Sequence, residues 1–256
     1  MANNYFLAAS LPPLVLGERP DITFDELIWR IGMNLKGEDL KKTQVFRRWI
    51  DLNNIRALYL EDSIDPRGNL SEKELDQALL LKDDLPEYVF DFLDQFETVQ
   101  QKLHYFPGLL SAYFREEQAQ EKGFLQHYLE FEWSWRLVLM AIQAKEIGRD
   151  VARELQFEDL KDPLVIHILA QKDMPSYEPP MEFVSLKEKY LACGPDPWQQ
   201  FKEIMSWRFK QIENLIQKPL FSIDWILSYM AQLLIIEEWN DLDRAKGEVI
   251  LEAFVG

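Results

Sequence analysis

The stretch RRWIDLNNIRALYLE, residues 47–61, decides how this chain folds. When it is wound as an α-helix, apolar side chains fill one broad arc and much of the opposite side. The broad arc is formed by Val45, Trp49, Leu52, Ile55, Tyr59 and Leu60. A helix that is apolar nearly all round is normally buried in a protein core. The stretch therefore predicts a buried central helix over about residues 39–61.

A narrow polar line interrupts this apolar surface. Arg47, Asp51 and Asn54 lie at positions i, i+4 and i+7, and residues at such spacings share one face of a helix. Arg56 falls within the apolar arc, so its guanidinium must reach the surface or find an acceptor. An Asp–Arg pair on a core helix explains the line as a local stabilising feature. The alternative is that the line is the signature of a repeated structural unit.

Similar lines appear twice more along the chain. In LEFEWSWRLVLMAIQAKE, residues 129–146, a polar line passes through Glu132, Arg136 and Gln143. In FSIDWILSYMAQLLIIEEW, residues 221–239, Asp224 leads a line that continues through Ser228 and Gln232, and Tyr229 stands beside it. Three apolar helices that each carry a leading acid at roughly even spacing suggest a degenerate triplication. We therefore expect an all-α protein of two or three helical units, at 1–85, 86–172 and 173–256, in a funnel-like or elongated body.

The composition favours a helical globular protein with a basic protein partner. Hydrophobic residues make up 47% of the 256 residues, and there are only 10 glycines. The formal charge of −16, from 28 basic against 44 acidic residues, disfavours a nucleic-acid partner, which requires clustered bases. It also disfavours an anionic bilayer surface and suits a basic protein. The single cysteine, Cys193, fits a reducing compartment.

The amino-terminal residues MANNYFLAASLPPLVL do not resemble a signal peptide, because no basic residue precedes the short apolar run. The two prolines predict an extended segment over residues 5–16. The sequence has no run of about 18 apolar residues that would span a membrane. We therefore expect a cytoplasmic protein without a direct membrane span.

Helix boundaries are predicted from capping patterns and prolines. Thr23 with Glu26, and Ser71 with Glu74, have the spacing of capping boxes. Pro107 is expected at the first turn of a helix that runs to Lys122. The predicted helices cover about 24–35, 39–61, 71–82, 86–96, 107–122, 124–155, 162–172, 182–192, 197–217 and 222–254, with a loop at 173–181.

Motifs for catalysis or cofactor binding are not apparent. The chain lacks GxxxxGK[ST] and GxGxxG, and its three histidines have no spacing to Cys193 that suits zinc. An EF-hand alignment over residues 63–74 would place Arg67 among the calcium ligands. We therefore expect no catalytic residue, cofactor or metal.

The segment from Trp49 to Arg56, with Asp51, Asn54 and Arg56 in an Asp-x-x-Asn-Ile-Arg pattern, resembles the C subunit of V-type and A-type ATPases. The segment at 221–239 is similar to another part of that family. The opening YFLAASLPPL, followed by DITFDEL, looks like a bacterial family that is encoded beside V-type ATPase subunits.

The resemblance implies a non-catalytic connector that couples the central shaft of a V-type ATP synthase to its membrane rotor ring, at the periphery of the inner membrane. Under this hypothesis Arg47, Asp51, Asn54, Arg56, Glu132, Arg136, Asp224 and Tyr229 are structural or interface residues. Two alternatives remain open, namely a helical enzyme with an acidic site and a general helical scaffold for protein interactions.

Overall fold

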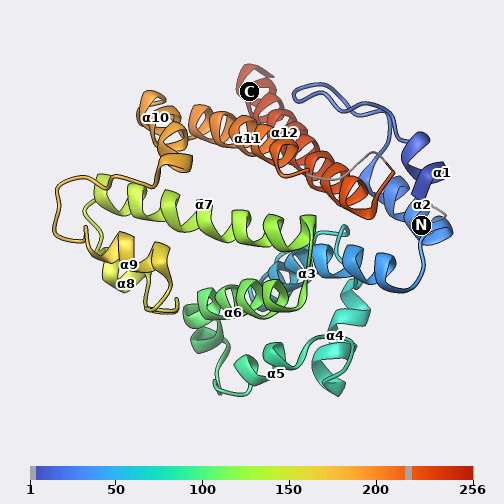
Figure 1. Ribbon diagram of the computed structural model, residues 1–256, viewed down its shortest axis with the longest axis horizontal. Coiled ribbons are helices and arrows are strands. Elements are labelled where there is room, and N and C mark those ends of the chain that lie inside the picture. The colour runs from blue at the N-terminus through green and yellow to red at the C-terminus, as the bar shows by residue number, and fades with distance from the viewer. Residues whose placement is uncertain (1–3, 217–220, 256) are drawn as a thin grey trace. The chain divides into compact units, whose positions relative to one another are not determined.

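The computed structural model describes residues 4–216 and 221–255, with side chains described through residue 242. Every regular element in this part of the chain is helical, which confirms the all-α prediction (Figure 1). The α-helices are α1 (Asn4–Ala9), α2 (Phe24–Asn34), α3 (Gly37–Tyr59), α4 (Glu72–Leu81), α5 (Glu87–Leu93), α6 (Val99–Gln120), α7 (Phe124–Glu146), α8 (Val151–Glu154), α9 (Pro163–Leu169), α10 (Val184–Ala192), α11 (Pro197–Asn214) and α12 (Ile223–Val255), and a short 3-10 helix, η1 (Met181–Phe183), precedes α10.

The chain groups into two compact units. Unit 1 comprises Met1–Thr43 and Glu188–Gly256, and unit 2 comprises Gln44–Lys187. The helix with Asp224 belongs to unit 1, whereas Asp51 and Glu132 belong to unit 2. The division into three consecutive repeated units stays a prediction, because compactness does not test whether the three helices share an ancestral unit.

In unit 1, α12 packs against α11, α2 and α1. Leu27 and Ile31 of α2 and Ile226 and Met230 of α12 are among its buried side chains. The backbone N–H of Phe24 donates to Glu237 Oε1 at 2.6 Å, which ties the start of α2 to α12. Apolar burial and this charge-assisted hydrogen bond together hold the unit.

In unit 2, α6 and α7 pack along each other, α5 packs on α6, and α8 and α9 pack on α7. The carboxyl-terminal part of α3 joins this core through its aromatic side chains. The ring centres of Trp49 and Phe114 are 5.2 Å apart, and those of Phe46 and Tyr128 are 5.1 Å apart. From Gln44 onward, the central helix is therefore a core element of unit 2, as its apolar arc predicts.

The capping signals set several helix starts as expected. Ser71 and Glu74 form a capping box at α4. Asp162 caps α9 by accepting from the N–H groups of Leu164 and Val165. Thr23 caps α2, but the Glu26 carboxylate pairs with Arg30 at 2.6 Å, so the predicted second half of that capping box is wrong.

Three other boundaries differ from the prediction. Residues 4–9 form helix α1 where an extended segment was expected, because Leu7 and Ala8 are buried in the core of unit 1.

Helix α6 starts after Thr98, which forms a capping box with Gln101, and Pro107 lies inside the helix instead of at its first turn. Helix α7 ends at Glu146, before Gly148 with its positive φ of 69°, so the predicted helix 124–155 is interrupted. Pro219, which lies between the predicted helices 197–217 and 222–254, is outside the described residues.

No helix in the described ranges is long and apolar enough to cross a lipid bilayer.

Candidate functional site

The polar line of α3 holds the turn that follows this helix. Asp51 Oδ1 accepts from the backbone N–H groups of Asn69 at 2.6 Å and Leu70 at 3.1 Å, and Oδ2 accepts from the Asn69 side chain at 2.6 Å. Asn54 donates to the carbonyl of Asp65 at 2.9 Å and accepts from its N–H at 2.8 Å. Asp51 is 1% exposed and Asn54 2% exposed. We call residues 65–70 the clamped turn.

Arg47 completes this arrangement from one helical turn earlier. Its guanidinium donates to the carbonyl of Arg67 at 2.9 Å and to the carbonyl of Gly68. Burial raises the pKa of Asp51, and the hydrogen bonds from Asn69 and Leu70 and the charge of Arg47 offset part of that rise. The side chains of the polar line are therefore engaged with backbone groups of the chain itself.

Gly68 lies directly against this line. A Cβ atom at Gly68 would lie 2.5 Å from Asp51 Oδ1 and 3.0 Å from Asn54 Nδ2. Real Cβ atoms do not approach other atoms this closely. The clamped turn therefore requires glycine at this position because of space.

Arg48, which follows Arg47 of the polar line, pairs with an acid of another helix. Its guanidinium pairs with Glu117 of α6, which is 5% exposed and also accepts from the Tyr88 hydroxyl at 3.0 Å. Burial would lower the pKa of Arg48, but the charge and hydrogen bond of Glu117 outweigh burial and raise it. Arg48 therefore ties α3 to α6.

Glu132 and Arg136 of α7 form the second polar line. Glu132, 2% exposed, accepts from Arg136 and from Trp135 Nε1 at 3.0 Å. The Arg136 guanidinium carbon lies 4.5 Å from the centre of the Trp49 ring and 4.8 Å from that of Trp135. Cation–π stacking and the ion pair therefore fix Arg136 between α7 and α3 within unit 2.

The remaining predicted residues are Asp224 and Tyr229 of α12, in unit 1, and Arg56 of α3. Asp224 is 3% exposed within α12, and Tyr229 of the same helix donates to the carbonyl of Pro12 at 2.9 Å. Arg56 of α3 is exposed, which is the first of the two outcomes expected for a guanidinium in the apolar arc. The three leading acids are all buried, but Asp51 binds backbone N–H groups whereas Glu132 binds side chains.

Replacing Tyr229 with phenylalanine is expected to destabilise unit 1 by about 1 kcal/mol at neutral pH, because the hydrogen bond to Pro12 is lost. Burial raises the pKa of Tyr229 to about 12. The neutral phenol therefore stabilises the folded state below its ordinary pKa of about 10, and this contribution is lost as the pH rises through about 12. Denaturant unfolding of both proteins should show the wild-type advantage shrinking between about pH 10 and 12. A difference that stays constant with pH would contradict this role.

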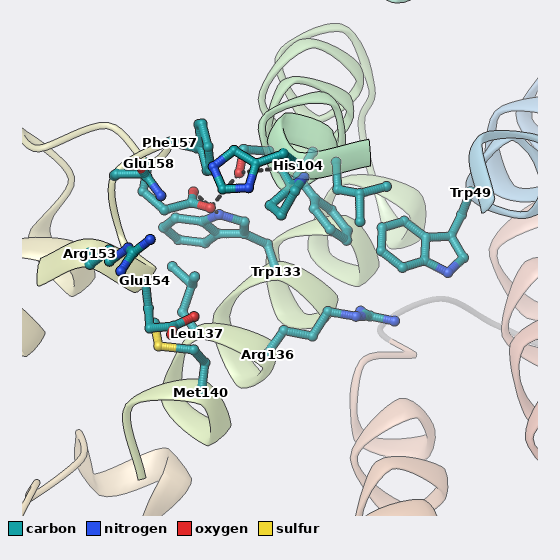
Figure 2. A pocket seen from close by; sticks show the side chains of 15 residues that line it. Trp49, His104, Trp133, Arg136, Leu137, Met140, Arg153, Glu154, Phe157 and Glu158 are labelled. Carbon is teal, nitrogen blue, oxygen red and sulfur yellow. Dashed lines mark hydrogen bonds between the residues drawn. The ribbon is translucent and has the colours of Figure 1, made fainter. Parts of the chain in front are cut away.

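A cavity of about 450 Å³ opens within unit 2 (Figure 2). Its walls combine aromatic, apolar and charged side chains, among them Trp49, Phe114, Trp133, Arg136, Met140, Phe157 and Glu158. A second cavity of about 160 Å³ shares Ser111, Phe114, Trp133, Phe157 and Glu158 with the first. We call the two together the Trp133 cavity.

Glu158 is the carboxylate most firmly placed in this cavity. One oxygen accepts from the Ser111 hydroxyl, and the other accepts from Trp133 Nε1 at 2.9 Å. Figure 2 shows the carboxylate lying against the edge of the Trp133 indole. Gly108 permits close packing here, because a Cβ atom would lie 3.2 Å from the Phe157 ring. The cavity is thus a preformed aromatic site with an oriented carboxylate.

Sequence reasoning missed Trp133, Phe157 and Glu158 as site residues. The Trp133–Glu158 hydrogen bond joins α7 to the segment after α8 across 25 residues, so no helical periodicity connects the two. Within the described residues, no three His, Cys, Asp or Glu side chains cluster in a way that could hold a metal ion.

Fold and site together define an all-α protein of two compact units whose buried polar side chains mainly brace the fold. The full chain, residues 1–256, matches the family described as "Protein of unknown function (DUF2764)", and the chain belongs to that family. It is 28% identical over 250 residues to an uncharacterized protein of Chlamydia trachomatis, with 94% of each chain covered. A similar relative from Chlamydia muridarum is 27% identical over 257 residues, covering 98% of this chain and 97% of the relative. No solved structure matches the chain.

Proposed function

We propose that this chain is a non-catalytic connector subunit of a V-type ATP synthase or ATPase, which couples the central shaft to the membrane rotor ring. The observation that carries the proposal is that Asp51 and Asn54 hydrogen-bond to the backbone of the chain itself. These residues of the C-subunit-like pattern are buried and bind the backbone of the clamped turn. They therefore stiffen a helical body, which is what a torque-transmitting part requires.

The charge of the chain supports a protein partner of opposite sign. The formal charge is −16, and electrostatic complementarity accelerates and orients association with a basic surface. A connector that receives a basic shaft end at the membrane periphery would use this field. The coupling ion and the direction of the reaction belong to the other subunits of such a complex.

An exposed apolar face on α2 supports assembly as well. Trp29 and Met33 are each 67% exposed and lie four residues apart, so they share one face of the helix. Large apolar side chains grouped on a surface commonly mark protein-binding sites. We propose that this face contacts a partner subunit.

The alternative of an acidic enzyme site has less support. Ser111 and Trp133 orient the Glu158 carboxylate, but Glu154 on the same cavity is exposed. An acid–base pair of carboxylates needs two such groups whose surroundings drive their proton affinities apart.

The test is co-purification of the affinity-tagged full chain from membranes of its host at low salt. We expect the shaft and ring subunits to be recovered with the wild-type chain. We expect Trp29→Ser to reduce that recovery severalfold without changing the melting temperature, because Trp29 is exposed. Leu80→Ser is the matched control, because Leu80 of α4 is 82% exposed. Tyr105→Ser would not serve, because the Tyr105 ring stacks on Phe96. Absence of ATPase subunits in the wild-type eluate would contradict the proposal.

A further inference from the structure

We propose that the Trp133 cavity receives a lysine or arginine side chain from a basic protein partner. The inference rests on the proposed function for the identity of that partner, but the cavity itself is described by the residues of unit 2 alone. The first observation is the shape of the site. About 450 Å³ is available in its larger part, and this is within the range of preformed ligand pockets.

The second observation is the state of the Glu158 carboxylate. Ser111 and Trp133 each donate one hydrogen bond to it, and both donors are neutral. An ionised carboxylate offers about four acceptor positions, so acceptor capacity remains for an incoming cation. The two neutral donors orient the group without cancelling its charge. An ammonium or guanidinium group would therefore meet a carboxylate that is already in place.

The third observation is the aromatic wall beside that carboxylate. Trp133, Phe157 and Phe114 line both parts of the cavity. Aromatic faces attract cations, and the attraction grows when water is excluded. The same unit already shows this contact, since the Arg136 guanidinium stacks 4.5 Å from the Trp49 ring centre. The aliphatic part of a lysine or arginine side chain would pack on the remaining apolar surface.

The charges around the cavity favour a cation over an anion. The carboxylates that line it belong to Glu130, Glu154, Glu158, Asp159 and Asp162. Of the arginines in the same lining, Arg136 faces Glu132, and Arg115 lies 3.2 Å from Glu116. Arg153 contributes one further positive charge at the cavity. Five acids thus line a site with three arginines. Two of those arginines are offset by acids outside the lining, and one of the acids, Glu154, lies 3.9 Å from Arg149 outside it, so negative charge remains in excess.

The site can be tested with the full-length protein and a short peptide of alternating arginine and glycine, acetylated and amidated at its ends. The readout is the indole N–H resonance of Trp133 in isotope-labelled protein, assigned by its loss in Trp133→Phe. We expect this resonance to shift saturably on addition of the peptide. Glu158→Gln should weaken binding about tenfold, because it removes the charge that the peptide meets while keeping the side-chain shape.

Glu97→Gln is the matched control, because Glu97 is exposed in the same unit and does not line the cavity. It should leave the peptide affinity within about twofold, and melting curves should show that all variants are folded. Equal weakening by Glu97→Gln and Glu158→Gln, or stronger binding of a glutamate–glycine peptide, would overturn the proposal.

The failure of this inference is distinguishable from failure of the proposed function. If the ATPase subunits co-purify but the Trp133 resonance does not respond to the arginine peptide, the cavity assignment is wrong and the connector role stands. If the peptide binds through Glu158 but no ATPase subunit co-purifies, the cavity assignment stands and the partner must be another basic protein.

Discussion

Replacing Asp51 with alanine is expected to lower the free energy of unfolding by about 3 to 5 kcal/mol. The substitution leaves the backbone N–H groups of Asn69 and Leu70 without their acceptor. It also removes one of the two acceptors of the Asn69 side-chain amide, which keeps the carbonyl of Gln44. Each buried donor that is left unsatisfied costs about 1 to 3 kcal/mol. The melting temperature should therefore fall by roughly 10 °C, given a shift of about 2 to 4 °C per kcal/mol for a chain of this size.

Two variants separate this explanation from a general effect of lost charge. Asp51→Asn keeps one oxygen for the backbone donors, so it should cost about half as much as Asp51→Ala. The remaining cost arises because the NH2 group of the introduced amide would face the donating NH2 group of Asn69. Asp76→Ala removes an acid from the exposed surface of α4, and its cost should stay below about 0.5 kcal/mol. Equal melting temperatures for wild type and Asp51→Ala would show that the polar line does not hold the clamped turn.

Replacing Gly68 with alanine is expected to cost about 2 to 3 kcal/mol, although the change adds a single methyl group. The added Cβ would lie 2.5 Å from the oxygen of Asp51 that accepts two backbone hydrogen bonds. Since Asp51 is held in place, either the clamped turn or the carboxylate must move, and overpacking of this kind costs about 1 to 3 kcal/mol.

Gly32→Ala is the matched control for this prediction. Gly32 lies inside α2, and a Cβ atom there would have no heavy atom within 4 Å. Alanine in a helix interior is favoured over glycine by about 0.5 to 1 kcal/mol. The same chemical change should therefore stabilise the protein at residue 32 and destabilise it at residue 68. A stability increase at Gly68 in denaturant unfolding would refute the close approach to Asp51.

The helical class and the importance of the central helix could be predicted from the sequence because both depend on local patterns. The apolar arc of residues 45–60 and the caps at Ser71 and Asp162 act within one or two helical turns. Pro107 misled the prediction because proline also occurs inside helices, and the capping box at Thr98 was the stronger signal. Helix α1 was missed because burial of Leu7 and Ala8 is a tertiary effect.

The partners of the polar residues could not be predicted from the helical pattern. The spacing of Arg47 and Asp51 predicts an interaction along α3, and the charge of Arg47 does act on Asp51. The same spacing does not show that Asp51 also accepts from a turn 18 and 19 residues further on. Arg48 likewise finds Glu117 at a separation of 69 residues. Such pairs depend on how helices pack, and single-sequence periodicity carries no information on that packing.

The proposed connector role makes a definite claim about energy coupling. A rigid passive part between shaft and ring carries torque, but ATP hydrolysis takes place elsewhere in the complex. Loss of the part should therefore separate the two activities. An enzyme or an unrelated scaffold would not produce that separation.

The most direct measurement is ATP-driven ion transport in membrane vesicles from cells with and without this chain, with ATP hydrolysis measured in the same vesicles. The connector role predicts that vesicles without the chain keep hydrolysing ATP but lose ion transport, and that adding the purified chain back restores transport. Ion transport that is unchanged without the chain would contradict the connector role.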